Sequence, residues 1–152
     1  AGRAVIVSAE TFWERVLGVS GDGRREHALF GQFQLHLGRN RSDDEPVSKI
    51  PPPEALVGWR VRAAADRWQG ELYARGALEQ DRLSAADEAD PRIPFGGTPA
   101  WWTLNARAHV RPTRTLRLGV ALENVFDVRY RIHGSGIDAP GRNLILSVEW
   151  IF

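Results

Sequence analysis

The sequence predicts an all-β protein: about seven antiparallel strands of an up-and-down transmembrane β-barrel, ending in the last strand of that barrel. Three observations predict this fold class. Apolar residues recur at every second position, long polar segments alternate with tight turns, and the apolar alternation continues to the final residue, Phe152. A barrel strand needs only about 9–11 residues with alternate side chains apolar, which agrees with a mean hydropathy of -0.33.

Composition excludes several other classes. The chain has 152 residues and a formal net charge of +1, so its charge does not indicate binding to nucleic acid or to an anionic lipid surface. It has no cysteine, which excludes disulfides and cysteine metal sites. No run of about 18 apolar residues is present, so we predict no transmembrane helix. The start of the chain lacks an initiator Met and a signal peptide, and we expect a fragment of a longer protein.

The clearest alternating segments lie near the C-terminus, at 102–110, 116–122 and 144–152. Each has one apolar face and one polar face, with Ile145 and Ile151 as exceptions on the polar face of the last segment. The three apolar faces comprise Trp102, Leu104, Ala106, Ala108 and Val110; Leu116, Leu118, Val120 and Leu122; and Leu144, Leu146, Val148, Trp150 and Phe152.

Earlier segments show the same pattern at 57–63, 68–78 and 33–37. The segment 3–16 is apolar at its start and ambiguous between a strand and a short helix after Glu10, and we predict a strand there. These segments bring the expected number of strands to about seven. A sheet of seven strands would be open if it stood alone, because a single-chain barrel needs about eight.

The connections between the predicted strands alternate in length. A two-residue turn at Ala65-Asp66 would place Arg60 opposite Glu71 and Trp59 opposite Leu72, so that an ion pair forms on the polar face. A second tight turn contains Pro112. The segments 39–54, 79–99 and 125–141 are long and polar, which is typical of the outer loops of a barrel. The last strand then runs inward and ends on the periplasmic side.

Alternation is also typical of a soluble β-sandwich that buries one face in a core. Two features favour the barrel. The polar face carries charged and amide side chains in the middle of nearly every strand, and the apolar pattern reaches the last residue, where sandwich termini usually fray into polar tails. A passive porin or adhesin-type barrel, without energy coupling, also stays open at this point.

Several motifs resemble the C-terminal part of TonB-dependent outer-membrane receptors. They are the SKIPPP segment at 48–53, the segment from Glu79 to Ala108 with its Thr-Pro-aromatic start of a strand, and LENVFDVRYRIHGSGIDAPGRNLILSVEWIF at 122–152. The last of these is the most specific, and GRAVIVSAE at 2–10 resembles an earlier strand of the family weakly. The likeness covers most of residues 1–152, which we expect to form one C-terminal barrel segment.

This resemblance implies a function for the intact parent protein. The parent would be a 22-stranded receptor with an N-terminal plug and a TonB box, neither of which is present here. It would bind a scarce small-molecule substrate, such as a ferric siderophore, haem or cobalamin, and import it with energy from the TonB complex. Its partners would be outer-membrane lipid, the TonB complex through the missing N-terminal part, and the barrel-insertion machinery, which would read the terminal Phe152.

Few residues stand out as candidate sites. His133 lies in the last outer loop and could contact or ligate haem, although a solvated loop histidine is commoner; the ligand-binding residues are otherwise unknown. The acidic residues Asp81, Asp87, Glu88 and Asp90 lack calcium-site spacing and are expected to form a solvated loop. No catalytic motif, resident metal or cofactor is predicted, so we expect no enzyme.

The remaining expectations concern placement. The residues expected to line the barrel interior, as a mutually neutralising wall, are Arg60, Glu71, Arg75, Arg107, Arg117, Glu123, Glu149, His36 and His109. The residues expected in aromatic girdles are Trp68, Trp101, Trp102 and Trp150. Gly134, Gly136 and Gly141 are expected to supply turns.

Overall fold

The computed structural model describes residues 3–152, without the side chain of Ala64. Gly2, the first residue of the weakly similar N-terminal segment, lies outside the described residues. The strands are β1 (Ala4–Val19), β2 (Arg25–Asn40), β3 (Glu45–Pro46), β4 (Glu54–Ala63), β5 (Trp68–Ala77), β6 (Trp101–Val110), β7 (Leu116–Glu123) and β8 (Asn143–Trp150). A 3-10 turn, η1 (Ala64–Asp66), and a helix, α1 (Ala85–Glu88), complete the elements.

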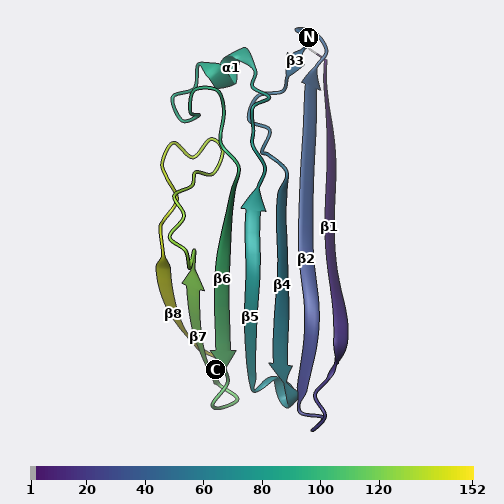
Figure 1. Ribbon diagram of the computed structural model, residues 1–152, viewed down its shortest axis with the longest axis vertical. Helices are drawn as coiled ribbons and strands as arrows, with labels where there is room; N and C mark the ends of the chain where they lie inside the picture. Colours follow the sequence, from purple (N-terminus) through teal and green to yellow (C-terminus); the bar gives the residue numbers. More distant parts are fainter. Residues whose placement is uncertain (1–2) are drawn as a thin grey trace.

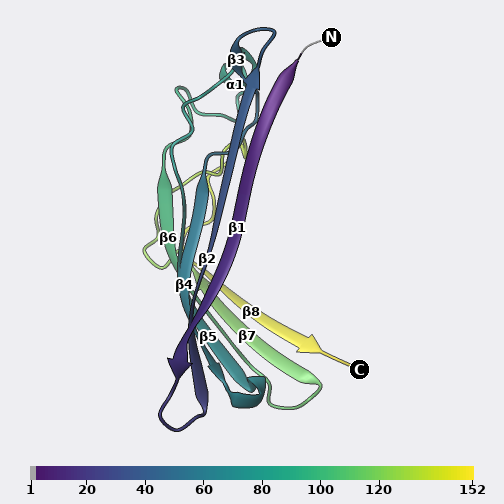
Figure 2. The same ribbon diagram turned by 90° about the vertical axis from the view of Figure 1, so that its right-hand side faces the viewer.

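All the strands belong to one antiparallel sheet with the order β1-β2-β4-β5-β6-β7-β8, and the two-residue β3 pairs with β2. Figure 1 shows the sheet face-on, and Figure 2 shows that it is twisted and stays open. Strands β1 and β8 form its two edges. The predicted fold class is confirmed, including the strand at the N-terminal end, where helix and strand were both conceivable.

The connection between β4 and β5 has the predicted geometry. Ala65 and Asp66 both have positive φ, 57° and 54°, which is the conformation of the two-residue turn that matches the twist of antiparallel strands. Trp59 consequently faces Leu72, and Arg60 faces Glu71. The register predicted from the loop length is therefore confirmed.

The two ends of the sheet carry different connections, as Figure 1 shows. The segments 41–53, 78–100 and 124–142 join strands at one end, which we call the long-loop end. The segments 20–24, 64–67 and 111–115 join strands at the other end, which we call the short-turn end. The chain enters the sheet at the long-loop end and leaves it at the short-turn end. This arrangement matches the predicted alternation of connections.

The distribution of polar and apolar side chains between the two faces of the sheet is the reverse of that in a soluble protein. On one face apolar side chains are exposed, for example Leu146 at 74% and Trp150 at 60%. On the other face polar side chains are buried: Glu71, Thr103 and Asn105 are no more than 6% exposed. We call these the outward and inward faces. A soluble sandwich would bury the apolar face instead.

The structure corrects some strand boundaries. Strand β2 begins at Arg25, eight residues before the predicted segment at 33–37. The prediction missed its first half because apolar Ala28 and Phe30 lie on the inward face there, so the alternation is irregular. Strands β5 and β8 end at Ala77 and Trp150 rather than at Leu78 and Phe152. The backbone N–H groups of Leu78 and Ile151 still donate to Pro53 and Thr115. Within residues 3–152 no helix is long and apolar enough to cross a membrane.

Candidate functional site: the inward face and the outer loops

A buried carboxylate stands at the centre of the inward face. Only 1% of the Glu71 side chain is exposed. Its Oε1 accepts from Arg60 Nε at 2.6 Å and from Gln69 Nε2 at 2.7 Å, and its Oε2 accepts from Arg107. Arg60 also pairs with Glu14 of β1. A buried charge is tolerated when it is paired and fully hydrogen-bonded. Glu71 thus joins β4, β5 and β6, and the pair between Arg60 and Glu14 extends the network to β1.

Other pairs extend this polar wall across the sheet. Arg75 Nη2 lies 2.9 Å from Glu54 Oε2, and Arg117 Nη1 lies 3.7 Å from Glu149 Oε2. Glu123 faces Asn143 of β8, on the same side of the sheet. The structure thus places all seven predicted wall charges on the inward face, and it pairs six of them as the neutralising arrangement requires. His36 and His109 lie on this face as well, next to Ser8 and Arg117 respectively.

The inward face is hollowed over strands β2, β4, β5 and β6. Six polar residues of the hollow offer amide, phenol, carboxylate and guanidinium groups: Gln32, Gln34, Glu54, Tyr73, Arg75 and Arg107. The guanidinium of Arg107 lies 5.3 Å from the ring centre of Tyr73, and that of Arg75 lies 5.6 Å from Trp101. Such a surface can hydrogen-bond a polar solute or a polypeptide that fills the interior.

A second buried carboxylate, Asp87, holds two outer loops together. Its Oδ1 accepts from Ser48 Oγ at 2.6 Å and from the Lys49 N–H at 3.0 Å, while its Oδ2 accepts from Ser84 at the start of α1. Burial alone would raise the pKa of Asp87, but these hydrogen bonds outweigh it and hold the pKa below its ordinary value. Gln80 Nε2 adds a 2.6 Å bond to the Ile50 carbonyl.

The expectation of a solvated acidic loop is therefore wrong for Asp87, which is 2% exposed. The reason is that the Ser84-x-x-Asp87 spacing forms a capping box, in which each side chain bonds the other residue's backbone N–H. Asp81 and Glu88 are exposed as expected, and Asp90 pairs with Arg92 at 2.6 Å. Among residues 3–152, no group of three or more His, Asp or Glu side chains is arranged to hold a metal ion.

The third outer loop, 124–142, contacts the second, 78–100, through His133. Its Nδ1 lies 2.9 Å from Oγ1 of Thr98, a residue that is only 1% exposed. Burial lowers the pKa of His133, and the nearby charge of Asp87 opposes this shift. The structure thus places His133 in a packed contact between loops, half-buried and bonded to protein, rather than in open solvent.

The motif that follows β7 forms a compact support for this loop. Asn124 is 2% exposed and has a positive φ of 50°. Its side chain donates to the carbonyls of Val128 and Pro140 and accepts from the Val128 N–H at 2.9 Å. Its own N–H donates to the Asn105 side chain of β6. One asparagine therefore satisfies the backbone of a turn that has no strand partner.

Glycine and aromatic residues complete the support. A β-carbon at Gly141 would clash with Oδ1 of Asp127, and that oxygen accepts from the Arg142 N–H. Gly141 thus allows a close approach, whereas Gly134 and Gly136 supply positive φ as predicted. Tyr130 packs on Trp101 with ring centres 4.2 Å apart.

The girdle prediction is wrong for Trp101. It faces Ala77 on the inward side and is 7% exposed, because alternation puts it opposite in direction to its neighbour Trp102. Trp68, Trp102 and Trp150 lie exposed on the outward face near strand ends, as expected of girdle residues.

Sequence reasoning missed three residues of these networks. Glu14 lies in the segment whose periodicity was ambiguous, so its inward position was not predicted. Asn124 carried no signal of burial beyond the family motif. Asp87 did carry a signal, the capping-box spacing that begins at Ser84.

The fold and its inverted faces define one class of protein: the wall of a transmembrane β-barrel. No protein-family model and no curated protein matches the sequence. Among solved structures, the chain is similar to the copper transporter OprC, with a TM-score of 0.78 and 21% sequence identity. The match covers 98% of this chain and 24% of the OprC chain, so this chain spans about a quarter of that length. The likeness shows the fold alone: an open antiparallel sheet that matches part of the OprC chain.

Proposed function

We propose that this chain forms the C-terminal wall strands and three outer loops of a TonB-dependent outer-membrane receptor that imports a scarce solute. The observation that carries the proposal is the inverted sheet, in which Glu71, Arg60 and Arg107 are networked on the inward face while leucine and tryptophan cover the outward face. A polar interior and an apolar exterior are the requirement for a barrel that conducts a polar solute through lipid.

The outer loops support a receptor rather than an open pore. They are bonded to one another through Asp87, Gln80 and His133 instead of extending separately into water. A pre-organised surface of this kind reduces the entropy lost on binding a ligand. By the family resemblance the solute is a ferric siderophore, haem, cobalamin or a similar compound, and the likeness to OprC adds copper to the candidates.

Two experiments test this proposal. The upstream coding sequence should contain a plug domain and a TonB box in the same reading frame. Cells with and without the gene should then be compared for uptake of radiolabelled copper ion, a ferric siderophore, haem and cobalamin, each with and without a protonophore. Energised import predicts gene-dependent uptake that the protonophore abolishes. Gene-dependent entry that persists with the protonophore would indicate a passive barrel instead.

The C-terminus takes part in this proposal as an assembly signal. Leu146, Val148 and Trp150 alternate on the outward face of β8 before the terminal Phe152. Deleting Phe152 from the full-length receptor should reduce the amount that reaches the folded, heat-modifiable form in the outer membrane. Normal assembly of this variant would contradict a role in insertion.

A further inference from the structure

The outward face carries an apolar groove that the wall function does not require. Its floor is a row of directly paired residues on four strands: Phe33 faces Ala55, Ala55 faces Gly76, and Gly76 faces Trp102. Large side chains thus stand at both ends of the row and small ones lie between them. The groove has a volume of about 460 Å³, and apolar atoms dominate its lining.

The depth of the groove depends on Gly76. A β-carbon at this position would lie 2.5 Å from the Trp101 carbonyl oxygen, so a larger residue is sterically excluded. Phe126 packs against Trp102 with ring centres 5.9 Å apart and steadies that wall. The floor is therefore kept bare by the backbone itself, and the aromatic walls project 39% and 57% exposed at Phe33 and Trp102.

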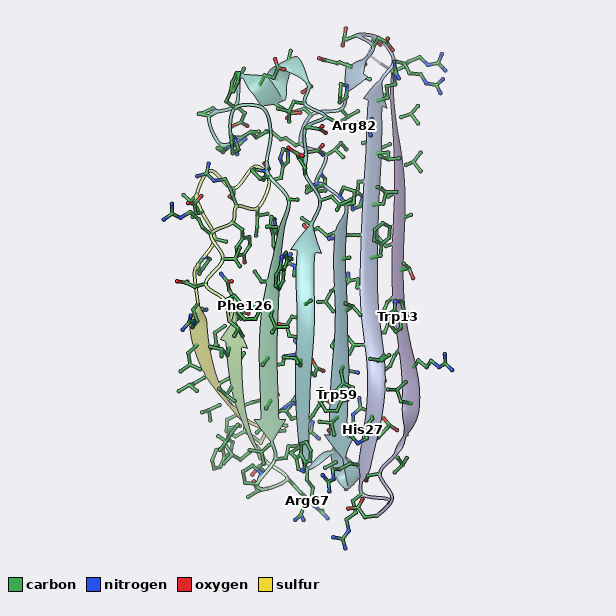
Figure 3. The ribbon with its side chains drawn as sticks, in the orientation of Figure 1. Trp13, His27, Trp59, Arg67, Arg82 and Phe126 are labelled. Atoms are coloured by element: carbon green, nitrogen blue, oxygen red, sulfur yellow. The ribbon has the colours of Figure 1, made fainter. Side chains whose placement is uncertain are left out.

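The groove continues toward the long-loop end and changes character there. Pro53 and Leu78 line both the groove and a smaller hollow between the upper part of β2 and residues 78–82. Arg82 also lines that hollow, and Figure 3 shows it beside the top of the sheet. Arg82 takes part in no ion pair with any residue of the described 3–152, although Glu79 and Asp81 flank the same hollow.

We propose that this groove binds one acyl chain of an outer-leaflet lipid, with the phosphate of the lipid headgroup held by Arg82. The placement in a membrane rests on the proposed function, and the groove goes beyond it. An amphiphile matches the gradient along the groove, which is apolar over four strands and polar at the loops. In lipid, a groove of this kind attracts a chain by close packing rather than by exclusion of water.

The test uses the full-length receptor that contains this segment, purified in detergent and freed of lipid. Dipalmitoyl phosphatidylglycerol is titrated, and bound lipid is counted by native mass spectrometry. Ala55→Trp fills the floor between Phe33 and Gly76. Ala108→Trp is the matched control, because Ala108 is likewise an exposed alanine, on the outward face of β6 and outside the groove.

Ala55→Trp should weaken retention of the tightest lipid about tenfold, the effect of losing roughly ten close carbon contacts, while Ala108→Trp should retain it. Arg82→Gln should weaken binding about two- to fivefold, as expected for an exposed charge pair. Arg67→Gln, at the opposite end of the sheet in Figure 3, should not.

Equal retention by wild type and Ala55→Trp, or equal loss in both tryptophan variants, overturns the groove. Unchanged affinity in Arg82→Gln overturns the assignment of the headgroup end. Solute uptake should be normal in the two tryptophan variants, because both positions lie on the outward face of the barrel, so a failed lipid result leaves the transport proposal standing. A receptor that stays soluble without detergent would overturn the membrane placement itself.

Discussion

At the long-loop end of the sheet, polar side chains are buried and bonded to one another, whereas at the short-turn end they remain in water. Ser84, Asp87, Thr98 and Asn124 are each no more than 2% exposed. The turns at 20–24 and 111–115, in contrast, are exposed along almost their whole length. Loops of a dozen residues or more must satisfy their backbone groups without strand partners, and here buried side chains do so. Two-to-five-residue turns need no such support.

The difference shows that the long-loop end has a defined tertiary structure outside the sheet, whereas the short-turn end does not. At the long-loop end a side-chain change should therefore propagate between loops, and at the short-turn end it should stay local. This contrast can be tested with variants of the full-length protein, in detergent or lipid.

Asn124→Ala should have the largest effect. It removes three side-chain hydrogen bonds and leaves part-buried backbone groups of Val128 and Pro140 without these partners. Local opening of residues 124–142 should become easier by about 3 kcal/mol, measured by hydrogen exchange with mass spectrometry. Thr113→Ala, at the short-turn end, is the matched control and should change exchange there by less than about 0.5 kcal/mol. Similar effects in the two variants would contradict the contrast.

Asp87→Asn should come next. All four hydrogen bonds to the Asp87 side chain come from donors, and an amide offers only one acceptor oxygen to them. We expect the contact that Asp87 makes between the loop segments 45–53 and 79–99 to weaken by about 2 kcal/mol. Lysine-specific proteolysis after Lys49 should accelerate accordingly.

Asp22→Asn provides the comparison for Asp87 at the other end. Asp22 is an exposed turn carboxylate, and hydrogen bonds from Ser20 and Arg24 lower its pKa. Its replacement should leave proteolysis after Lys49 unchanged. Faster cleavage in both Asp87→Asn and Asp22→Asn would mean that the loops respond to general destabilisation of the protein rather than to the loss of the Asp87 hydrogen bonds.

Acid should loosen the third loop through His133. Its pKa lies below the ordinary value of 6.5 when the loop is packed, so the open loop takes up a proton first as the pH falls. The contribution of the packed imidazole to the stability of the closed loop is therefore fully present above pH 6.5, and it is lost as the pH falls from 6.5 through the lowered pKa. A spin label at Ile137→Cys should become more mobile across that window. His133→Gln should remove the pH dependence, and a persistent transition would assign it to another group.

Ala65→Gly should have the smallest effect on stability, and unlike the other variants it should stabilise the protein. Ala65 holds φ at 57°, which costs an L-residue roughly 1 kcal/mol. Glycine relieves this cost but loses more entropy on folding, so a net stabilisation of a few tenths of a kcal/mol is expected. Equilibrium unfolding in urea should detect it, while exchange at the long-loop end should not change.

The sequence predicted the sheet better than it predicted the loops, for a physical reason. In a strand, alternation fixes the direction of every side chain, so the positions of Arg60, Glu71 and Leu146 followed from their parity alone. Parity also places Trp101 on the inward face, a consequence that the girdle interpretation of adjacent tryptophans overlooked. The loops have no such period. Contacts such as Asp87 with Lys49, or His133 with Thr98, join residues 35 or more positions apart, and no local pattern encodes them.

One contact at the edge of the sheet determines how its longest hairpin aligns. The indole of Trp13 on β1 lies over Gly31 on β2, where a β-carbon would be only 2.5 Å from the ring. Figure 3 shows Trp13 along the edge strand. Sliding β1 by a single residue would turn this ring to the charged side and bring Glu14 into hydrocarbon. The absence of a side chain at Gly31 therefore fixes the register of the sixteen residues of β1, whose own pattern is weak, against β2.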